Sequence, residues 1–387
     1  MINALFYGFE ILFILSSAAI FLFLTYRMWI NLRFLKHIHR QAKLDAAPQS
    51  RVSVLIPARN EVKTIARCVH SLTKQSHPNY EIIVLDDASS DGTTAILQQL
   101  SREIPTLKTI YSTEEIPYGW NGKSFACQRL AQASESEYLL FTDADTVHHP
   151  ESIAKGLAFM QRLQLDFLSV SPTQITISPL EKVMVSFIVD FLPILGLDYQ
   201  AIQTGQSQRI AANGQYILVK AAVYHDLGGH QSIRKALVDD FALARLFQAH
   251  HAALAYVNSV EMVECRMYQN GVEVWQGFSK NILLGLENSD QGGQQPLNAL
   301  LFAWGYACLF VLPFAYLLHP ELWWAGLSSI AYLLGLRAIF NLYLKRPADE
   351  IFTSYLAAWG VMALSLNALY KRWRGQAVIW KGRRYKV

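Results

Sequence analysis

The stretch "YEIIVLDDASSDGTTAILQQLSREI", residues 80–104, passes from an apolar run through an acidic turn into a helix-like segment. The run "EIIVLDD" is rich in β-branched and other apolar residues, as buried strands are. "SSDGT" supplies residues that favour turns and helix caps. The stretch therefore predicts a strand that is followed directly by a helix.

The same order occurs on both sides of this stretch. Upstream, "VSVLIP" (52–57) precedes the helix-like "NEVKTIARCVHSLTKQ" (60–75), and downstream "YLLFTDAD" (138–145) is another apolar run that ends in acids. Strands that alternate with helices predict an α/β domain with a mainly parallel sheet, which we place at residues 45–290. Ligands of such sheets bind beyond the carboxyl ends of the strands.

The composition indicates a membrane protein. Of the 387 residues, 52% are hydrophobic and only 17% are charged, and the net charge of +4 is too small to suggest a nucleic-acid partner. Residues 5–25 are apolar for long enough to cross a bilayer, with Glu10 as the one charge. Basic residues follow this run rather than precede it. We therefore expect an anchor at residues 1–30, an outer N-terminus and a cytoplasmic α/β domain at the cell membrane.

The C-terminal part, residues 295–387, predicts further membrane helices. Apolar stretches at 297–318, 322–344 and 351–370 follow the Gly/Gln-rich break at 288–296, and a basic tail follows them. A basic tail should be cytoplasmic, whereas three crossings would place it outside. We therefore expect that one segment, either 351–370 or the Arg337-bearing 322–344, does not cross.

Another apolar segment, residues 178–199, is interrupted by Asp190 and Pro193. It is expected to be an amphipathic helix on the membrane surface, with a core helix as the alternative.

Acidic residues gather after the predicted strands. They are Glu61 in "PARNE" (57–61), Asp86 with Asp87, Asp143 with Asp145, and Asp239 with Asp240. Turn chemistry, helix capping or the helix dipole would explain each pair alone. Asp143 and Asp145, one residue apart in a turn, can direct their oxygens to one point, an arrangement that suits Mg²⁺ or Mn²⁺.

Taken together, the order and spacing of these segments over residues 51–290 resemble the inverting glycosyltransferases of family 2, which have the GT-A fold. The resemblance implies that the nucleotide of a UDP-sugar contacts Pro57, Arg59, Glu61, Asp86 and Asp87. It implies that Asp143 lies near the ribose or metal and that Asp145 binds the metal. It makes Asp240 the general base, with Asp239 in the place of a glutamate of the family.

The chemistry of the transfer agrees with these roles. A hydroxyl that attacks the anomeric carbon needs a carboxylate to take its proton, and a departing nucleoside diphosphate needs a divalent cation. A metal-bound carboxylate cannot also serve as the base, so two separate pairs fit two roles. Direct displacement would invert the anomeric centre.

Other residues are weaker candidates. Lys123, in "GWNGKSFA" (119–126), would meet the diphosphate or be a solvated lysine. Asn213, Gly214 and Gln215 are expected to border the sugar on the acceptor side, and His230 either reaches the metal or makes a simple polar contact. His148 and His149 are interpreted as surface residues.

The cysteines, Cys68, Cys127, Cys265 and Cys308, form no cluster in the sequence. We interpret them as small buried apolar residues rather than as ligands of zinc or members of a disulfide framework.

The chain departs from the processive members of the family, because it has no Gln-x-x-Arg-Trp motif after the predicted base. "ECRMYQNGVEVWQGFSKN" (264–281) stands in the corresponding region. There Arg266, Trp275 and Lys280 are candidates for related roles. Trp275 would offer an aromatic face to the acceptor, and Arg266 or Lys280 would offer a cation to the diphosphate. This departure argues against a processive polymerase.

The whole chain most resembles bacterial glycosyltransferases associated with carotenoid and hopanoid pathways. The expected function is transfer of one sugar, glucose from UDP-glucose, to a lipophilic acceptor such as a carotenoid. The alternatives are a glycolipid or polysaccharide synthase with another lipid acceptor, and an inactive membrane scaffold.

Overall fold

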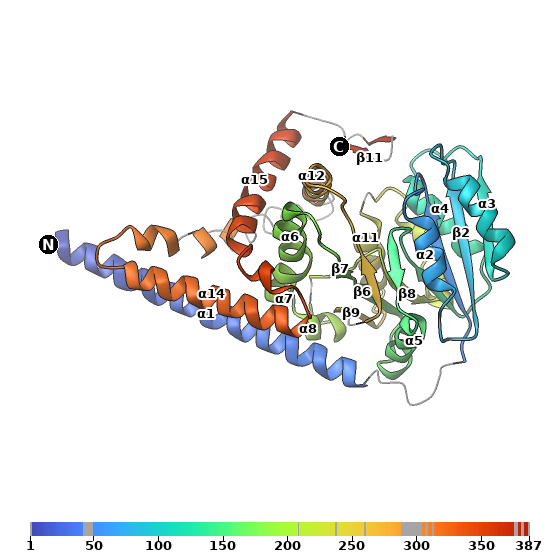
Figure 1. Ribbon diagram of the computed structural model, residues 1–387. Coiled ribbons are helices and arrows are strands. Elements are labelled where there is room, and N and C mark those ends of the chain that lie inside the picture. The colour runs from blue at the N-terminus through green and yellow to red at the C-terminus, as the bar shows by residue number, and fades with distance from the viewer. Residues whose placement is uncertain are drawn as a thin grey trace.

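The computed structural model describes residues 2–41, 49–207, 209–236, 238–258, 261–287, 304–305, 309–311, 313–374, 378–380 and 383–385. An α/β domain lies at one end and a group of long helices projects from it (Figure 1).

The α/β domain contains a seven-stranded sheet in the order β3-β2-β1-β4-β8-β6-β9. All of its pairings are parallel except those of β8 with β4 and β6. The expected mainly parallel sheet is therefore confirmed. Its strands are β1 (Val52–Ala58), β2 (Tyr80–Asp87), β3 (Leu107–Ser112), β4 (Tyr138–Phe141), β6 (Phe167–Ser171), β8 (Ile217–Lys220) and β9 (Leu254–Asn258).

Helices bury both faces of this sheet, as parallel strands require. Val54 in β1 packs in the same core as Val69 of α2, whereas the next residue, Leu55, packs with Leu130 of α4 and Phe247 of α11 on the other face. The helices of the domain are α2 (Ile65–Leu72), α3 (Thr93–Glu103), α4 (Gly122–Gln132), α5 (Ser152–Arg162), α8 (Tyr199–Gln203), α9 (Ala221–Asp226), α10 (Gly229–Ser232) and α11 (Asp239–Ala249).

Pro57 lies inside β1, although it was expected to end the strand. The N–H of Thr142 donates to the carbonyl of Leu55, so alternate residues of β1 face β4. Because β4 ends at Phe141, opposite Leu55, the missing N–H of Pro57 falls where the sheet no longer needs a donor.

A small second sheet lies after the carboxyl end of β4. It has the order β5-β10-β7 and contains β5 (Thr146–His148), β7 (Thr173–Gln174) and β10 (Val263–Cys265). β5 begins directly after Asp145, so this sheet fixes the far side of the acidic turn 143–145.

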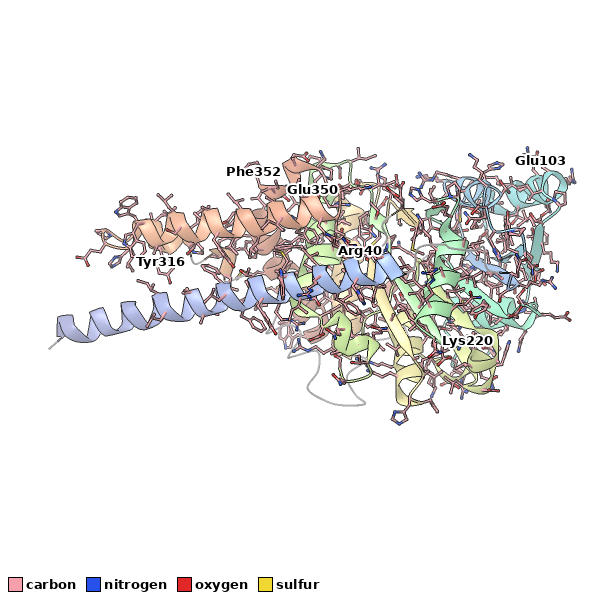
Figure 2. The ribbon with its side chains drawn as sticks, turned by 90° about the horizontal axis from the view of Figure 1, so that it is seen from below. Arg40, Glu103, Lys220, Tyr316, Glu350 and Phe352 are labelled. Atoms are coloured by element: carbon pink, nitrogen blue, oxygen red, sulfur yellow. The ribbon has the colours of Figure 1, made fainter. Side chains whose placement is uncertain are left out.

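The projecting helices include two that are long and apolar enough to cross a membrane, among the residues described. They are residues 17–40 of α1 (Ile2–Gln41) and all of α14 (Trp323–Tyr343). The two helices run side by side in the same direction. The hydroxyl of Tyr332 in α14 donates to the Phe21 carbonyl of α1. In Figure 1 both helices run from the tip toward the α/β domain, and in Figure 2 Tyr316, which precedes α14, lies toward the tip and Glu350, which follows α14, lies toward the α/β domain.

The last long helix, α15 (Ser354–Trp373), does not meet the same criteria and packs on α12 (Gly271–Glu287) and α6 (Pro179–Val185). The Asn367 amide donates to the Ser279 hydroxyl across the α12 contact at 2.8 Å. Half of the expected segment 297–318 lies outside the described residues. The remaining elements are η3 (Ala348–Ile351), β11 (Val378–Trp380) and β12 (Arg383–Tyr385).

Residues 178–199 are a buried connection, and the expected surface helix was wrong. They form α6 (Pro179–Val185), the π-helix η1 (Ser186–Phe191) and α7 (Leu192–Gly196), with Phe187, Phe191 and Ile194 buried. Arg337 of α14 points into this connection, where it hydrogen-bonds to Ser186 and lies 3.5 Å from Glu350. Protein therefore covers the charge that made segment 322–344 doubtful as a membrane span.

Candidate active site

The loops after β1 and β2 are joined by hydrogen bonds. The N–H of Asn60 donates to the Ser89 hydroxyl at 2.9 Å, and the N–H of Ser90 donates to the Asn60 side chain at 2.8 Å. The N–H of Glu61 donates to the Thr93 hydroxyl at 2.8 Å. Asn60 has a φ of 55°, which asparagine tolerates better than most residues. The two loops therefore form one rigid wall of the site.

Asp86 and Asp87 have different surroundings in this wall. The Asp86 carboxylate is buried and accepts hydrogen bonds from the Ser89 N–H and the Thr94 hydroxyl, so it closes its own loop. Asp87 lies beside Arg59, whose guanidinium donates to the Asp87 carbonyl and lies 3.9 Å from its carboxylate. Of the residues expected to contact the nucleotide, Asp86 has its two oxygens engaged within the protein.

The acidic turn after β4 has an open side and a buried side. Asp143 and Asp145 are partly exposed, whereas Thr142, Ala144 and Thr146 between and beside them are buried. Hydroxyl contacts hold the buried side, because Thr142 donates to the Gln215 carbonyl at 2.8 Å and Thr146 donates to the Asp143 carbonyl at 2.8 Å. The turn therefore presents both carboxylates from a fixed backbone.

The histidine beside this turn corrects an expectation from the sequence. His148 is buried, with Nε2 3.0 Å from the Thr142 hydroxyl and Nδ1 3.0 Å from the Ser152 hydroxyl. Burial lowers the pKa of His148 to about 3, so the ring is neutral and supports the turn from behind. His149 is half-exposed as expected and contacts Glu264 at 3.2 Å.

Lys123 lies between two of the acid pairs. The Asn121 side chain caps α4 by accepting from the Lys123 N–H at 3.1 Å, which places this lysine in the first turn of the helix. Its ammonium is 2.8 Å from a carboxylate oxygen of Asp143 and 3.6 Å from one of Asp239. Burial alone would lower the pKa of Lys123, but these carboxylates outweigh it and hold the pKa above its ordinary value. The lysine stays charged and joins the two pairs.

Asp240 is oriented by two backbone donors. The N–H of Gly214 donates to one carboxylate oxygen at 3.1 Å and the N–H of Phe241 to the other at 2.8 Å. Burial, and secondly the charge of Asp239, raise the pKa of Asp240. A carboxylate that is ionised but basic is suited to accept a proton near neutral pH.

Gly214 lies at the centre of this arrangement. A Cβ there would stand 3.0 Å from the Lys123 ammonium, and 3.7 Å both from an Asp143 oxygen and from the Asp240 Cβ. Only a residue without a side chain leaves these groups undisturbed. Gln215, by contrast, is buried and its amide donates to the Cys265 thiol, so it does not border a sugar directly.

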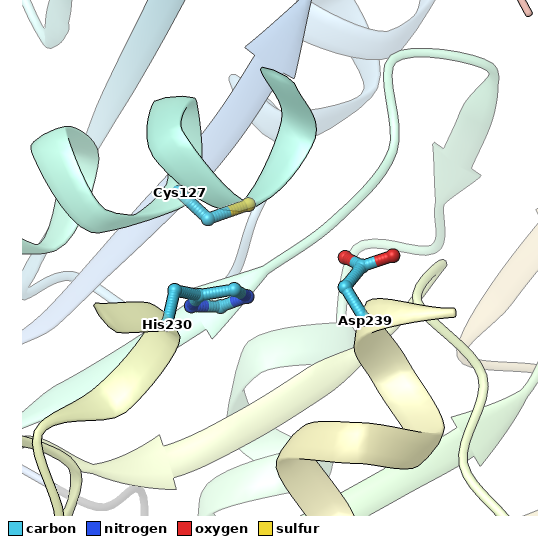
Figure 3. A group of neighbouring side chains, drawn as sticks. All are labelled: Cys127, His230 and Asp239. Carbon is cyan, nitrogen blue, oxygen red and sulfur yellow. The ribbon is translucent and has the colours of Figure 1, made fainter. Parts of the chain in front are cut away.

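Behind Asp239 lies a group that the sequence did not reveal. The ligand atoms of Cys127, His230 and Asp239 lie within 4.8 Å of one another, on α4, α10 and α11 (Figure 3). Burial lowers the pKa of His230 to about 4 and raises the pKa of the Cys127 thiol. His230 Nδ1 lies 2.8 Å from the Tyr224 hydroxyl, which fixes the ring. These residues are far apart in the chain, so no local spacing could indicate them.

Two donor sets could therefore be considered for a metal. Mg²⁺ and Mn²⁺ take one or two carboxylates and complete their coordination with phosphate oxygens and water, which the partly exposed Asp143 and Asp145 fit. The set of Cys127, His230 and Asp239 offers sulfur, nitrogen and oxygen, as zinc prefers. The Lys123 ammonium lies near both sets, 2.8 Å from Asp143 and 3.6 Å from Asp239, so its charge does not distinguish them.

The candidates from residues 264–281 lie at the junction with the helical part. The Arg266 guanidinium makes two hydrogen bonds to Glu181 of α6, at 3.0 and 3.2 Å, so it does not serve a diphosphate in this arrangement. Burial alone would raise the pKa of Glu181, but Arg266 and other donors lower it to about 2. Trp275 and Lys280 are on α12, where Trp275 is exposed.

The comparison with family models identifies the α/β domain. Residues 53–227 match the model described as glycosyl transferase family 2. This chain carries a family 2 glycosyltransferase domain. The matched range contains the loops after β1 and β2, Lys123, the acidic turn and Gly214. Asp239 and Asp240 follow the matched range, and they belong to the site because Lys123 and Gly214 contact them.

Curated relatives extend the similarity of the glycosyltransferase domain to most of the chain. The 4,4'-diaponeurosporenoate glycosyltransferase of Staphylococcus haemolyticus is 25% identical over 299 residues, 76% of either chain. The protein of the same name from Staphylococcus aureus strain MRSA252 is 24% identical over 347 residues, 87% of this chain and 88% of that one. Both relatives carry names of glycosyltransferases.

A solved structure shares the fold. The mannosyltransferase PcManGT from Pyrobaculum calidifontis, in complex with GDP-Man and Mn²⁺, gives a TM-score of 0.52 at 18% identity. The match covers 92% of this chain and 99% of the other. The glycosyltransferase domain of this chain thus has the GT-A-type fold expected from its motifs.

Proposed function

We propose that this protein is a membrane-attached glycosyltransferase that moves one sugar from a UDP-sugar, with glucose as the expected sugar, to a lipophilic acceptor such as a carotenoid. The family 2 domain supports the reaction class. The names of the two staphylococcal relatives support an acceptor of the carotenoid acid type. The apolar helices α1 and α14 support attachment to the cell membrane.

The observation that carries the proposal is the position of Lys123. Its ammonium contacts Asp143 at 2.8 Å and Asp239 at 3.6 Å, and Asp239 directly precedes Asp240. Acid pairs almost a hundred residues apart in the chain are thereby brought to one centre. A transferase needs this proximity, because the proton is taken and the diphosphate leaves on opposite sides of the same sugar carbon.

Asp240 is proposed as the general base. An acceptor hydroxyl attacks the anomeric carbon, its proton passes to Asp240, and the bond to the nucleoside diphosphate breaks with its electron pair on the departing oxygen. This single displacement inverts the anomeric centre. The backbone N–H groups of Gly214 and Phe241 hold the carboxylate in one orientation for this step.

Asp143, Asp145 and Lys123 are proposed to receive the diphosphate end of the donor. Asp145, with Asp143, would hold Mg²⁺ or Mn²⁺, which supplies charge stabilisation to the departing diphosphate when bound. The mannosyltransferase that shares the fold contains Mn²⁺. Arg59 and Asp87, on the wall formed by the two joined loops, are proposed to contact the nucleoside together with Pro57 and Glu61.

The proposed topology in the membrane uses the parallel course of α1 and α14. With the N-terminus outside, the positive-inside rule places the basic half of α1 and the glycosyltransferase domain in the cytoplasm. Because α14 runs in the same direction, it would also enter from outside and end on the cytoplasmic side. The proposed arrangement leaves α15, which packs on α12 and α6, on the cytoplasmic side as well.

The test uses membranes that contain the full chain, with Mg²⁺ or Mn²⁺, labelled UDP-glucose and a lipid extract of the host that includes carotenoid acids. Mass spectrometry should find a product one hexose heavier than an acceptor. Asp145→Ala should lose donor binding, whereas Asp240→Asn should bind donor but lose turnover with hydroxyl acceptors. A polymeric product would favour a polysaccharide synthase. Unchanged nucleotide binding in Asp145→Ala, with no turnover by the natural chain, would leave the inactive scaffold as the better description.

A further inference from the structure

A groove on α1 carries chemistry that the glycosyl transfer does not use. It has a volume of about 730 Å³ and lies between α1, the end of α5 and α8. Apolar side chains such as Trp29 and Phe34 line one part, and the basic or imidazole side chains Arg33, His37 and Arg162 line another. The groove therefore combines an apolar wall with positive charge.

The walls of this groove are fixed by packing. Met28 and Leu35, which do not line the groove, are buried against the domain on the opposite side of α1, so the helix cannot roll. The Asn31 amide of α1 also donates to the Ile194 carbonyl at 2.7 Å. On the groove side, the Arg33 guanidinium lies 5.2 Å from the centre of the Trp29 ring. The cation and the aromatic wall are thus held together.

The groove lies just beyond the apolar run of α1. That run ends at residue 25, and a helix rises 1.5 Å per residue, so Trp29 and Arg33 follow it by about 6 and 12 Å. The headgroup layer beside each face of the hydrocarbon core is roughly 5–7 Å thick, which is the level of Trp29. The Arg33 guanidinium reaches back toward that level, because it lies 5.2 Å from the centre of the Trp29 ring. Trp29 is 54% exposed, as a residue that meets lipid should be.

The groove is also separate from the catalytic site. β6 is antiparallel to β8, which is antiparallel to β4, so β6 and β4 point in the same direction. Arg162 ends α5 shortly before β6 begins at Phe167, whereas Asp143 follows the end of β4. The groove therefore lies near the amino ends of these parallel strands, whereas the acid pairs lie near the carboxyl ends. Its ligand is not the donor.

We propose that this groove binds one phospholipid of the bilayer that carries an anionic headgroup. Arg33, His37 and Arg162 take the headgroup, and Trp29 and Phe34 contact the apolar part of the lipid. A groove of this size accommodates a headgroup with its glycerol and the first carbons of its chains. This inference depends on the proposed membrane attachment, because the lipid comes from the bilayer that α1 enters.

The test measures lipid binding by native mass spectrometry of the detergent-purified full chain, with phosphatidylglycerol or phosphatidylcholine added. Phosphatidylglycerol should bind in a one-to-one complex and more tightly than phosphatidylcholine. Arg33→Gln combined with Arg162→Gln should weaken the binding of phosphatidylglycerol about tenfold or more, as expected for two lost cations at a membrane surface. Arg33→Lys should retain most of the binding, because it keeps the charge.

The matched control is Lys36→Gln combined with Arg40→Gln. It removes the same charge from exposed positions of the same domain, outside the groove, and should bind phosphatidylglycerol as the natural chain does. If both double variants lose the same amount of phosphatidylglycerol binding, the proposal is overturned, because the net charge alone would then explain the binding. Equal binding of the two lipids would overturn it as well, and so would competition by inorganic phosphate alone, which would indicate a free-anion site.

Donor binding separates this inference from the proposed function. The double variant Arg33→Gln, Arg162→Gln should bind UDP-sugar with unchanged affinity, because the groove and the acid pairs lie at opposite ends of the strands. If the natural chain does not bind the donor, the proposed function is contradicted, whereas the result of the lipid measurement still stands. Retained donor binding with no selective lipid binding would contradict the groove alone.

Discussion

At the scale of single residues, Asp240 combines a raised pKa with two fixed backbone donors. Burial and the neighbouring charge of Asp239 raise its pKa to about 6, whereas an exposed aspartate titrates near 3.9. Activity that needs the deprotonated form of a group is lost as the pH falls through the pKa of that group. The acidic limb of the rate therefore reports the environment of this carboxyl group.

We predict that kcat/KM rises with pH through about 6 and is flat above about 7. Asp239→Asn removes the neighbouring charge and should move the limb to lower pH. The measurement is the pH dependence of single-hexose transfer to a hydroxyl acceptor between about pH 5 and pH 8, with saturating metal. A rate that stays constant over this range would exclude Asp240 as a base with a raised pKa.

The same residue distinguishes acceptor classes. A hydroxyl acceptor loses a proton during attack, so Asp240→Asn should lower kcat about 10²- to 10⁴-fold. A carboxylate acceptor is already ionised at neutral pH and needs no base, so the same variant should retain much more of its rate. Parallel assays with a carotenoid alcohol and a carotenoid acid provide the comparison. Equal losses with both acceptors would show that Asp240 acts through binding rather than proton transfer.

Gly214 provides a test of the central geometry. In Gly214→Ala the new Cβ would stand 3.0 Å from the Lys123 ammonium, so the lysine must shift away from Asp143. We predict a severalfold higher KM for the donor with little change in thermal stability. Gly335→Ala is the matched control, because a Cβ at Gly335 meets no atom within 4 Å. An unchanged donor KM in Gly214→Ala would show that Lys123 does not contact the donor.

Part of the site could be predicted from the sequence because its acids follow strands whose ends must meet. Asp143 follows the end of β4, whereas Asp239 and Lys123 lie in the first turns of α11 and α4, and the fold brings the three side chains together. Their chemical roles remain predictions. His148 was placed wrongly at the surface, since nothing local to "TVHHP" indicates that Thr142 and Ser152 enclose its ring. The proximity of Cys127 and His230 was also missed, because these two residues come from separate helices.

At the scale of elements, the pair of Glu181 and Arg266 connects α6 to the strand end after β10. Glu181 is 1% exposed, and both of its oxygens accept hydrogen bonds from Arg266 at 3.0 and 3.2 Å. Removal of Arg266 would leave the negative charge of the buried Glu181 uncompensated, which is strongly destabilising. The pair therefore holds the helical part against the glycosyltransferase domain.

We predict that Arg266→Met lowers the free energy of unfolding by about 3 kcal/mol and leaves the donor KM nearly unchanged. The combination with Glu181→Gln should recover part of the loss, because no uncompensated charge then remains. Thermal unfolding in detergent and donor titration measure the two quantities. A raised donor KM at unchanged stability would instead support the role that the sequence suggested for Arg266, as a cation for the diphosphate.

The segment 178–199 illustrates what hydropathy cannot decide. An amphipathic pattern is the same whether lipid or protein covers its apolar side. Here the cover comes from helices more than a hundred residues later, and Arg346 brings its guanidinium to within 4.0 Å of Asp190. The sequence indicated correctly that Asp190 interrupts the apolar run, but its partner could be found only from the fold.

At the scale of the whole molecule, the parallel course of α1 and α14 bears on the conflict over the basic tail. If α14 ends on the cytoplasmic side and α15 stays there, the tail that follows is cytoplasmic, as its charge requires. Between α12 and α14 the chain must then return once to the outer side.

We predict that green fluorescent protein fused after residue 387 is fluorescent, and that alkaline phosphatase fused at the same point is inactive. An alkaline phosphatase fusion at about residue 320, before α14, should be active because that point would lie outside. The opposite pair of results would require α15 to cross the membrane.

The continuity of α1 has a further consequence for the acceptor. Its 40 residues form one helix of about 60 Å, twice the roughly 30 Å thickness of the hydrocarbon core. A single helix that is fixed both in the bilayer and along the domain keeps the catalytic groups at a constant height above the lipid. The enzyme would then select acceptors by reach: a molecule whose reactive oxygen projects that far from the bilayer is glycosylated, and one whose oxygen stays deeper is not.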